Sequence, residues 1–125
     1  MKPRHILFAG LLFMLLAVAL GAFGAHALKA ILGEAQLQTW KTASSYHFYH
    51  ALALIGLGIW AERQNPQRSI SASGLFFVIG ILLFSGSLYL MSVTGMRWLG
   101  MVTPLGGVMF LAGWVSWMLA LLKKI

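Results

Sequence analysis

Two histidines and two tyrosines lie close together in one short stretch of the chain, at Tyr46, His47, Tyr49 and His50. Imidazole serves in proteins as a general base, a proton carrier and the commonest metal ligand. Tyr46 and His50 are four residues apart, and His47 and His50 are three apart, so each pair can share one face of a helix. This stretch is therefore the first candidate for a functional site.

Isolated polar residues in other apolar segments extend this candidate site. They are His26, Ser85, Ser87, Tyr89 and Thr103. The groups that usually complete a catalytic or metal site are scarce, because the chain has no cysteine and its two acidic residues are Glu34 and Glu62. A serine–histidine pair here lacks a carboxylate to orient its base. We therefore predict a protein that is not an enzyme.

The composition indicates a membrane protein. The 125 residues are 60% hydrophobic and 9% charged, against roughly 25% charged in a soluble domain. Each of four runs without Lys, Arg, Asp or Glu reaches the ~20 residues that a helix needs to cross the bilayer. The alternation typical of β-barrel strands is absent. The four runs are His5–Leu28, Thr42–Ala61, Ser69–Met96 and Trp98–Leu122.

These runs predict an all-α fold, an integral membrane four-helix bundle made of a single transmembrane domain over residues 1–125. The spans are predicted at about 6–27, 42–61, 70–92 and 101–122. Only helices satisfy the backbone of such segments in lipid.

Positive charge predicts the orientation. One side of the predicted bundle carries six cations: Lys2, Arg4, Arg63, Arg68, Lys123 and Lys124. The other side carries three: Lys29, Lys41 and Arg97. Both termini are therefore predicted to be cytoplasmic. Because the cations lie at span ends, the net charge of +7 predicts contact with membrane lipid headgroups and not with nucleic acid.

This topology brings the polar residues into the outer half of the bundle. His26 ends the first span, and Tyr46 lies early in the second. His50 is nine residues past Lys41, which is roughly 13 Å along a helix axis. Ser85, Ser87, Tyr89 and Thr103 fall in the same half, and the cytoplasmic half is predicted to be nearly pure hydrocarbon. Polar groups in a bundle face inward or pair with each other.

Five short motifs in a fixed order resemble a known family. They are Gly21-Ala22-Phe23-Gly24-Ala25-His26, Tyr46-x-x-x-His50, Phe84-Ser85-Gly86-Ser87-Leu88-Tyr89, Thr103-Pro104-Leu105-Gly106-Gly107 and Gly113-Trp114. Together they resemble the bacterial domain-of-unknown-function family 423, whose eukaryotic relatives are called transmembrane protein 256. The resemblance covers about Gly10 to Leu122 and implies a four-helix protein of the inner membrane without an established activity. His47 departs from the family pattern, in which this position is often glutamine, so the resemblance directs attention to His26 and His50.

The leading hypothesis for the cluster is an interhelical hydrogen-bond network that fixes the bundle. Hydrogen bonds inside membranes average roughly 0.6 kcal/mol, so such a network adds specificity more than strength. The main alternative is a site for a lipid, a quinone or another small molecule between the helices. The small residues of the motifs permit packing within the bundle, self-association as a homo-oligomer, or contact with another membrane protein.

Two further alternatives stay open from the sequence. A haem or metal site would use His26 with His50, because His47 and His50 on one helix cannot both be axial ligands of one haem. A transporter would depend on histidine coupling, since the two acidic residues lie outside the spans or at their edge. The sequence names no cofactor.

Overall fold

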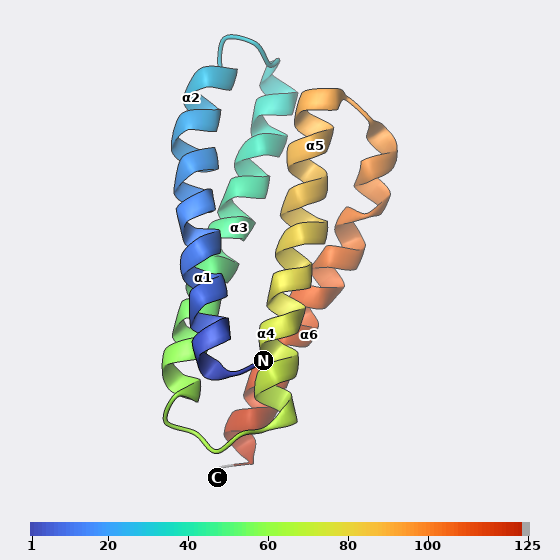
Figure 1. Ribbon diagram of the computed structural model, residues 1–125. Coiled ribbons are helices and arrows are strands. Elements are labelled where there is room, and N and C mark those ends of the chain that lie inside the picture. Colours follow the sequence, from blue (N-terminus) through green and yellow to red (C-terminus); the bar gives the residue numbers. More distant parts are fainter. Residues whose placement is uncertain (124–125) are drawn as a thin grey trace.

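The computed structural model describes residues 1–123, and every secondary-structure element in that range is a helix (Figure 1). The elements form four rods joined by short turns. In chain order they are α1 (Pro3–Val18), the π-helical turn η1 (Ala19–Gly24) and α2 (Ala25–Leu28); α3 (Glu34–Ala61); α4 (Arg68–Gly80), the π-helical turn η2 (Ile81–Ser85) and α5 (Gly86–Thr94); and the 3₁₀ turn η3 (Arg97–Met101) with α6 (Thr103–Leu122).

The rods run up and down in sequence, so α1 begins and α6 ends near the same end of the bundle (Figure 1). The all-α four-helix prediction is confirmed. Three of the rods, Pro3–Leu28, Arg68–Thr94 and Arg97–Leu122, are long and apolar enough to cross a membrane. The predicted spans 6–27, 42–61 and 70–92 lie within helical rods, and 101–122 covers the last residue of η3, Val102 and α6. The membrane boundaries themselves stay a prediction.

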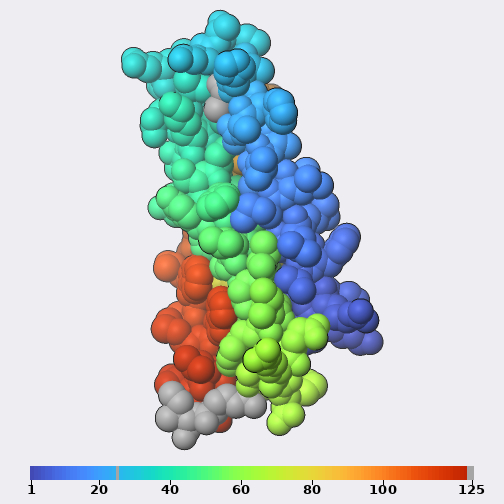
Figure 2. All heavy atoms as spheres, turned by 90° about the vertical axis from the view of Figure 1, so that its left-hand side faces the viewer, coloured from blue at the N-terminus to red at the C-terminus, as the bar shows by residue number. Residues whose placement is uncertain are grey.

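The most polar rod, α3, has more buried residues than any other helix of the described chain. It packs along α1 on one side and against α4, η2 and α5 on another. Figure 2 shows α1 in blue lying along α3 in green, with the lower part of α6 in red on the opposite flank of α3. The three apolar rods thereby bury the side chains of His47 and His50 away from lipid, where an unpaired polar group is costly, while those of Tyr46 and Tyr49 stay exposed.

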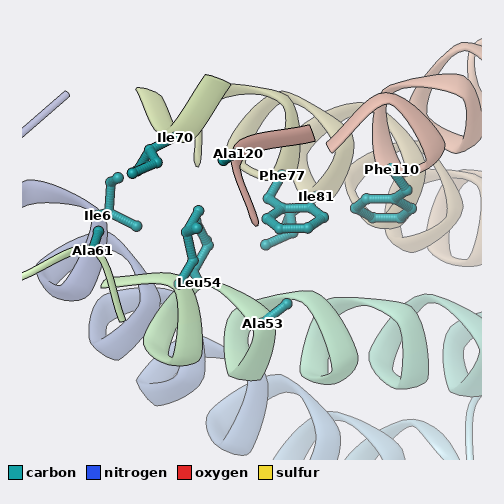
Figure 3. Close-up of a cluster of buried hydrophobic side chains, with 10 residues drawn as sticks. Ile6, Ala53, Leu54, Ala61, Ile70, Phe77, Ile81, Phe110 and Ala120 are labelled. Atoms are coloured by element: carbon teal, nitrogen blue, oxygen red, sulfur yellow. The ribbon is translucent and has the colours of Figure 1, made fainter. Parts of the chain in front are cut away.

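A cluster of buried apolar side chains fills the space between the rods (Figure 3). Ile6 of α1, Leu54 of α3, Phe77 of α4 and Phe110 of α6 are all almost completely buried. Because lipid tails are as apolar as these side chains, the cluster holds the rods together through close packing.

Glycines permit the closest helix contacts. A Cβ built on Gly10 would lie 2.7 Å from the backbone nitrogen of Ile55, and one on Gly58 would lie 2.7 Å from that of Leu7. The backbones of α1 and α3 therefore approach each other at two levels. Small residues commonly allow such approach in membrane bundles.

Candidate functional site

His50 lies near the middle of α3 and connects this helix to α6. Its side chain is 5% exposed and stacks on Phe110, with ring centroids 3.5 Å apart and planes inclined by 6°. Its Nδ1 lies 2.8 Å from the carbonyl oxygen of Tyr46, one turn earlier. Its Nε2 accepts the indole N–H of Trp114 at 3.1 Å. Stacking and one hydrogen bond therefore join α3 to α6 at this residue.

The two partners of His50 assign the position of its proton. A carbonyl oxygen only accepts and an indole N–H only donates. The proton therefore lies on Nδ1, and Nε2 carries the lone pair that Trp114 uses. If Nε2 also carried a proton, its N–H would face the indole N–H of Trp114, and the two donors would repel each other. The lone pair that would bind a metal or a haem iron is already engaged in this arrangement.

His47 lies one turn before His50 but faces other helices. Its Nδ1 is 2.9 Å from the hydroxyl oxygen of Tyr89 on α5, and that hydroxyl donates to Ser44 Oγ at 3.3 Å. The ring of Phe13 on α1 contacts His47 edge-on, with centroids 5.9 Å apart. The two histidines therefore belong to separate sets of contacts on different sides of α3.

Two predicted serines form contacts of their own. Ser85 is completely buried, and its hydroxyl donates to the carbonyl oxygen of Ala43 at 2.8 Å, joining η2 to α3. The hydroxyl oxygen of Ser87 lies 2.6 Å from that of Thr103, and this hydrogen bond joins α5 to α6. The Ser87 hydroxyl also donates to the Phe84 carbonyl oxygen at 2.9 Å. These serine contacts link three of the four rods.

His26 does not join these contacts. It lies on α2 at the far end of the first rod, its side chain is exposed, and the described residues offer it no hydrogen bond. The first rod packs on α3 chiefly through α1, so α2 extends past the closely packed region. The pair of His26 with His50 that a haem or metal site would use is therefore not formed, because His50 is buried at mid-length of α3.

Tyr46 takes part through its backbone and its ring. Its carbonyl accepts the His50 proton, and its ring centroid lies 4.6 Å from that of Phe84. The side chain is 40% exposed, and no hydrogen bond to its hydroxyl is found among the described residues. The Tyr46 hydroxyl therefore contributes no hydrogen bond, among the described residues, to the network expected from the sequence.

Besides the bond of Tyr89 to Ser44, two further interhelical bonds involve residues that the sequence analysis did not single out. The hydroxyl of Ser73, which is completely buried, donates to the Gly113 carbonyl at 2.8 Å and joins α4 to α6. The indole N–H of Trp40 donates to the Leu20 carbonyl within η1 at 3.0 Å. Ser73 corrects the expectation that the cytoplasmic half holds almost only hydrocarbon. The available signal was the row of serines at Ser69, Ser71 and Ser73 that opens this rod.

No group of three or more His, Cys, Asp or Glu side chains lies together among the residues that the structure describes. The polar contacts instead divide into three sets on different sides of α3 and α6. The first centres on His50, the second on His47 and the third on the serines.

Sequence comparison assigns the family. Residues 20–107 match the family model described as protein of unknown function DUF423. The chain belongs to the DUF423 family. This DUF423 protein is 45% identical over 114 residues to the UPF0382 membrane protein YwdK of Bacillus subtilis, covering 91% of this chain and 93% of the relative. No solved structure matches the chain.

Two further relatives of this DUF423 chain carry similar names. The UPF0382 inner membrane protein YgdD of Escherichia coli K12 is 40% identical over 118 residues, covering 91% of this chain and 86% of the relative. The UPF0382 membrane protein SERP0230 of Staphylococcus epidermidis is 39% identical, covering 91% and 92%. The family is one of unknown function, and these relatives are named as membrane proteins. The DUF423 chain is accordingly a small membrane protein.

Proposed function

We propose that this DUF423 protein is a non-enzymatic, multi-pass protein of the bacterial inner membrane, in which the polar cluster is an interhelical structural network. The observation that carries the proposal is the state of His50. Both of its nitrogens are engaged, one by a carbonyl of its own helix and one by an indole of another helix. A histidine held in this way has no free lone pair with which to bind a metal or take up a proton. Its contacts fix the rotation of α3 relative to α6.

The serines support the same role. Ser85 donates to a backbone carbonyl of another rod, and Ser87 contacts Thr103 and a carbonyl of its own rod. Neither hydroxyl contacts a histidine among the described residues, so neither is activated as a nucleophile would be. A membrane helix satisfies its serines in this way because an unpaired hydroxyl in hydrocarbon is costly.

The proposed location also draws on a relative. The protein of Escherichia coli is named as an inner membrane protein, and this chain matches it over most of its length. The surplus of cations on the side of both termini supports a cytoplasmic position for them.

A double-mutant cycle on His50 and Trp114 tests the network. His50→Phe and Trp114→Phe each keep an aromatic ring and remove one member of the hydrogen bond. We expect a coupling free energy of about 0.6 kcal/mol, and no more than about 1.7 kcal/mol, in detergent unfolding, which are the average and the largest values found for hydrogen bonds in membrane proteins. A coupling indistinguishable from zero would contradict the structural role.

Trp117→Phe provides the matched control. Trp117 lies on the same helix and stacks on Trp114, with centroids 5.8 Å apart and planes inclined by 8°. Its indole makes no hydrogen bond to His50. We therefore expect His50→Phe and Trp117→Phe to have additive effects on the free energy of unfolding.

A further inference from the structure

A hollow lies at the end of the bundle where α1 begins, between the first residues of the chain and the turn that joins α3 to α4. Its volume is about 140 Å³, far more than one water molecule needs. Figure 1 shows the start of the chain beside α4 at this end of the bundle. A second hollow adjoins the first, and both are lined by Pro66, Gln67 and Ser71.

Two extended segments form the walls of this hollow. The Ser71 hydroxyl donates to the Met1 carbonyl oxygen at 3.1 Å, which holds the segment before α1 against α4. Lys2 is extended, with φ −73° and ψ 152°, and α1 starts directly after it. Gln67 is extended as well, with φ −139° and ψ 143°, and α4 starts at Arg68. The starts of two helices therefore meet here, and each brings one basic side chain.

Positive charge exceeds negative charge around the hollow. Lys2 lines the hollow and Arg68 lines the adjoining one, and both side chains are exposed. Glu34 begins α3 at the opposite end of the bundle, so Glu62 is the only acidic side chain of the sequence at this end, and it lines neither hollow. The partial positive charge of the two helix starts adds to that of the side chains. The hollow therefore favours an anion.

The inner wall of the hollow is apolar. Ala61 and Ile70 line it and are almost completely buried, and Pro66 extends the apolar surface toward the turn. Farther along, α1 and α4 expose large apolar side chains, including Phe8 and Leu75, which are half or more exposed. A small soluble anion gains nothing from these surfaces. The glycerol backbone and the acyl chains of a lipid would cover them.

The position of the hollow along the bundle suits a lipid headgroup. The predicted spans end at about residue 61 and begin at about residues 6 and 70, so Lys2 and Arg68 lie just outside them. The predicted orientation places this end of the bundle at the cytoplasmic leaflet. Basic pockets between transmembrane helices on that side are typical binding sites for anionic headgroups.

The remaining polar groups favour a hydroxylated headgroup. The side-chain amides of Gln64, Asn65 and Gln67 belong to residues that line the hollow, and an amide both donates and accepts hydrogen bonds, as a hydroxyl does. Phosphatidylglycerol offers two hydroxyls and a net negative charge. Phosphatidylethanolamine offers an ammonium group, which Lys2 and Arg68 repel. The charges and the amides therefore favour the first of these lipids.

We propose that this hollow binds one anionic phospholipid of the phosphatidylglycerol type, whose phosphate pairs with Lys2 and Arg68 and whose acyl chains lie along α1 and α4. The proposal goes beyond the structural role of the His50 network, because it concerns the other end of α3 and no residue of that network. Either proposal can therefore fail without the other.

The test counts lipids bound to the purified full-length protein by native mass spectrometry in a neutral detergent, which presents no charged membrane surface. The probes are dioleoylphosphatidylglycerol and dioleoylphosphatidylethanolamine, which have the same acyl chains. We expect the first to bind about fivefold or more tightly, the change in affinity that one cation near a lipid headgroup makes. Equal binding of the two lipids would overturn the proposal.

Inorganic phosphate separates a lipid site from a site for a soluble anion. We expect phosphate at the same concentration as the lipid to leave phosphatidylglycerol bound, because phosphate cannot cover the apolar wall formed by Ala61 and Ile70. Displacement of the lipid by an equal concentration of phosphate would overturn the proposal and would indicate a soluble anion as the ligand.

Arg68→Gln and Arg63→Gln form a matched pair of variants. Each removes one positive charge from an exposed arginine at the same end of the bundle, but Arg63 lines neither hollow. We expect Arg68→Gln to weaken phosphatidylglycerol binding about fivefold and Arg63→Gln to leave it unchanged. Lys2→Gln should behave like Arg68→Gln. Equal losses in the Arg63 and Arg68 variants would overturn the proposal, because they would indicate a diffuse effect of charge.

The variant that lacks both Lys2 and Arg68 provides a readout that does not depend on stability. The ratio of phosphatidylglycerol to phosphatidylethanolamine bound by the same protein sample reports on the charges alone. We expect this preference to disappear when both residues are replaced by glutamine. A preference that survives the double substitution would show that other residues hold the phosphate, and it would overturn the assignment of the site.

Discussion

Gly106 of α6 lies against the backbone of Phe84 in η2, so close that a Cβ on Gly106 would overlap the nitrogen and Cα of Phe84. Its neighbour Gly107 is different, because a Cβ there would lie 3.9 Å from the Phe84 ring, an ordinary contact. Two adjacent glycines thus have opposite roles. Gly106 sets the distance between the third and fourth rods, while Gly107 does not.

Gly106→Ala is expected to destabilise the bundle by about 1–3 kcal/mol, because the new methyl group must push two helix backbones apart. Gly107→Ala is expected to be neutral or stabilising by up to about 1 kcal/mol, since alanine favours the helix over glycine. Detergent-induced unfolding followed by circular dichroism measures both. Equal effects of the two substitutions would mean that the α6–η2 contact is looser than described.

Ser85→Ala is expected to lower the free energy of unfolding by about 0.6 kcal/mol and by no more than about 1.7 kcal/mol. The substitution removes the hydroxyl that donates to the Ala43 carbonyl of another rod. Ser45→Ala is the matched control on α3, because its hydroxyl donates at 3.0 Å to the Lys41 carbonyl of its own helix. The same unfolding assay should give a change within about 0.5 kcal/mol for Ser45→Ala. A larger loss for Ser45 than for Ser85 would count against an interhelical role for the Ser85 hydroxyl.

His26→Ala is expected to leave stability unchanged within about 0.5 kcal/mol, because the side chain is exposed and makes no hydrogen bond among the described residues. His50→Ala, in contrast, removes a buried ring that stacks on Phe110 and accepts from Trp114. We expect it to cost about 2–5 kcal/mol, by analogy with other large-to-small changes in packed interiors. Melting temperatures of the two purified variants compare them directly. A large loss of stability in the His26→Ala variant would instead indicate that His26 pairs with His50.

The orientation can be tested by cysteine labelling, since the chain has no cysteine of its own. Arg63→Cys and Arg97→Cys replace exposed arginines in turns at opposite ends of the bundle. With both termini cytoplasmic, a membrane-impermeant maleimide should label the cysteine at position 97 in intact spheroplasts. The cysteine at position 63 should react only after the membrane is opened. The reverse pattern would invert the predicted topology.

The overall fold followed from the sequence because hydropathy is a local property. A run of about 20 apolar residues must form a helix in lipid whatever its neighbours are. Four such runs with short connections therefore predicted an up-and-down bundle, and the cluster around Tyr46–His50 drew attention to α3. The roles within the cluster were less predictable. His47 and His50 are three residues apart, yet one contacts Tyr89 and the other Trp114.

The sequence by itself thus determined the helices, their order and the segment in which polar side chains are concentrated. Only the tertiary structure decided which of these side chains meet. In the structure, His26 lies apart from the cluster, and Tyr46 contributes its carbonyl oxygen and not its hydroxyl. Trp114, Ser44 and Ser73 provide hydrogen-bond partners. The physical reason is that hydrogen-bond partners depend on the rotation and axial position of each helix. These are set by close packing, such as that of Gly58 on Leu7 and Gly106 on Phe84, and close packing joins residues far apart in the chain.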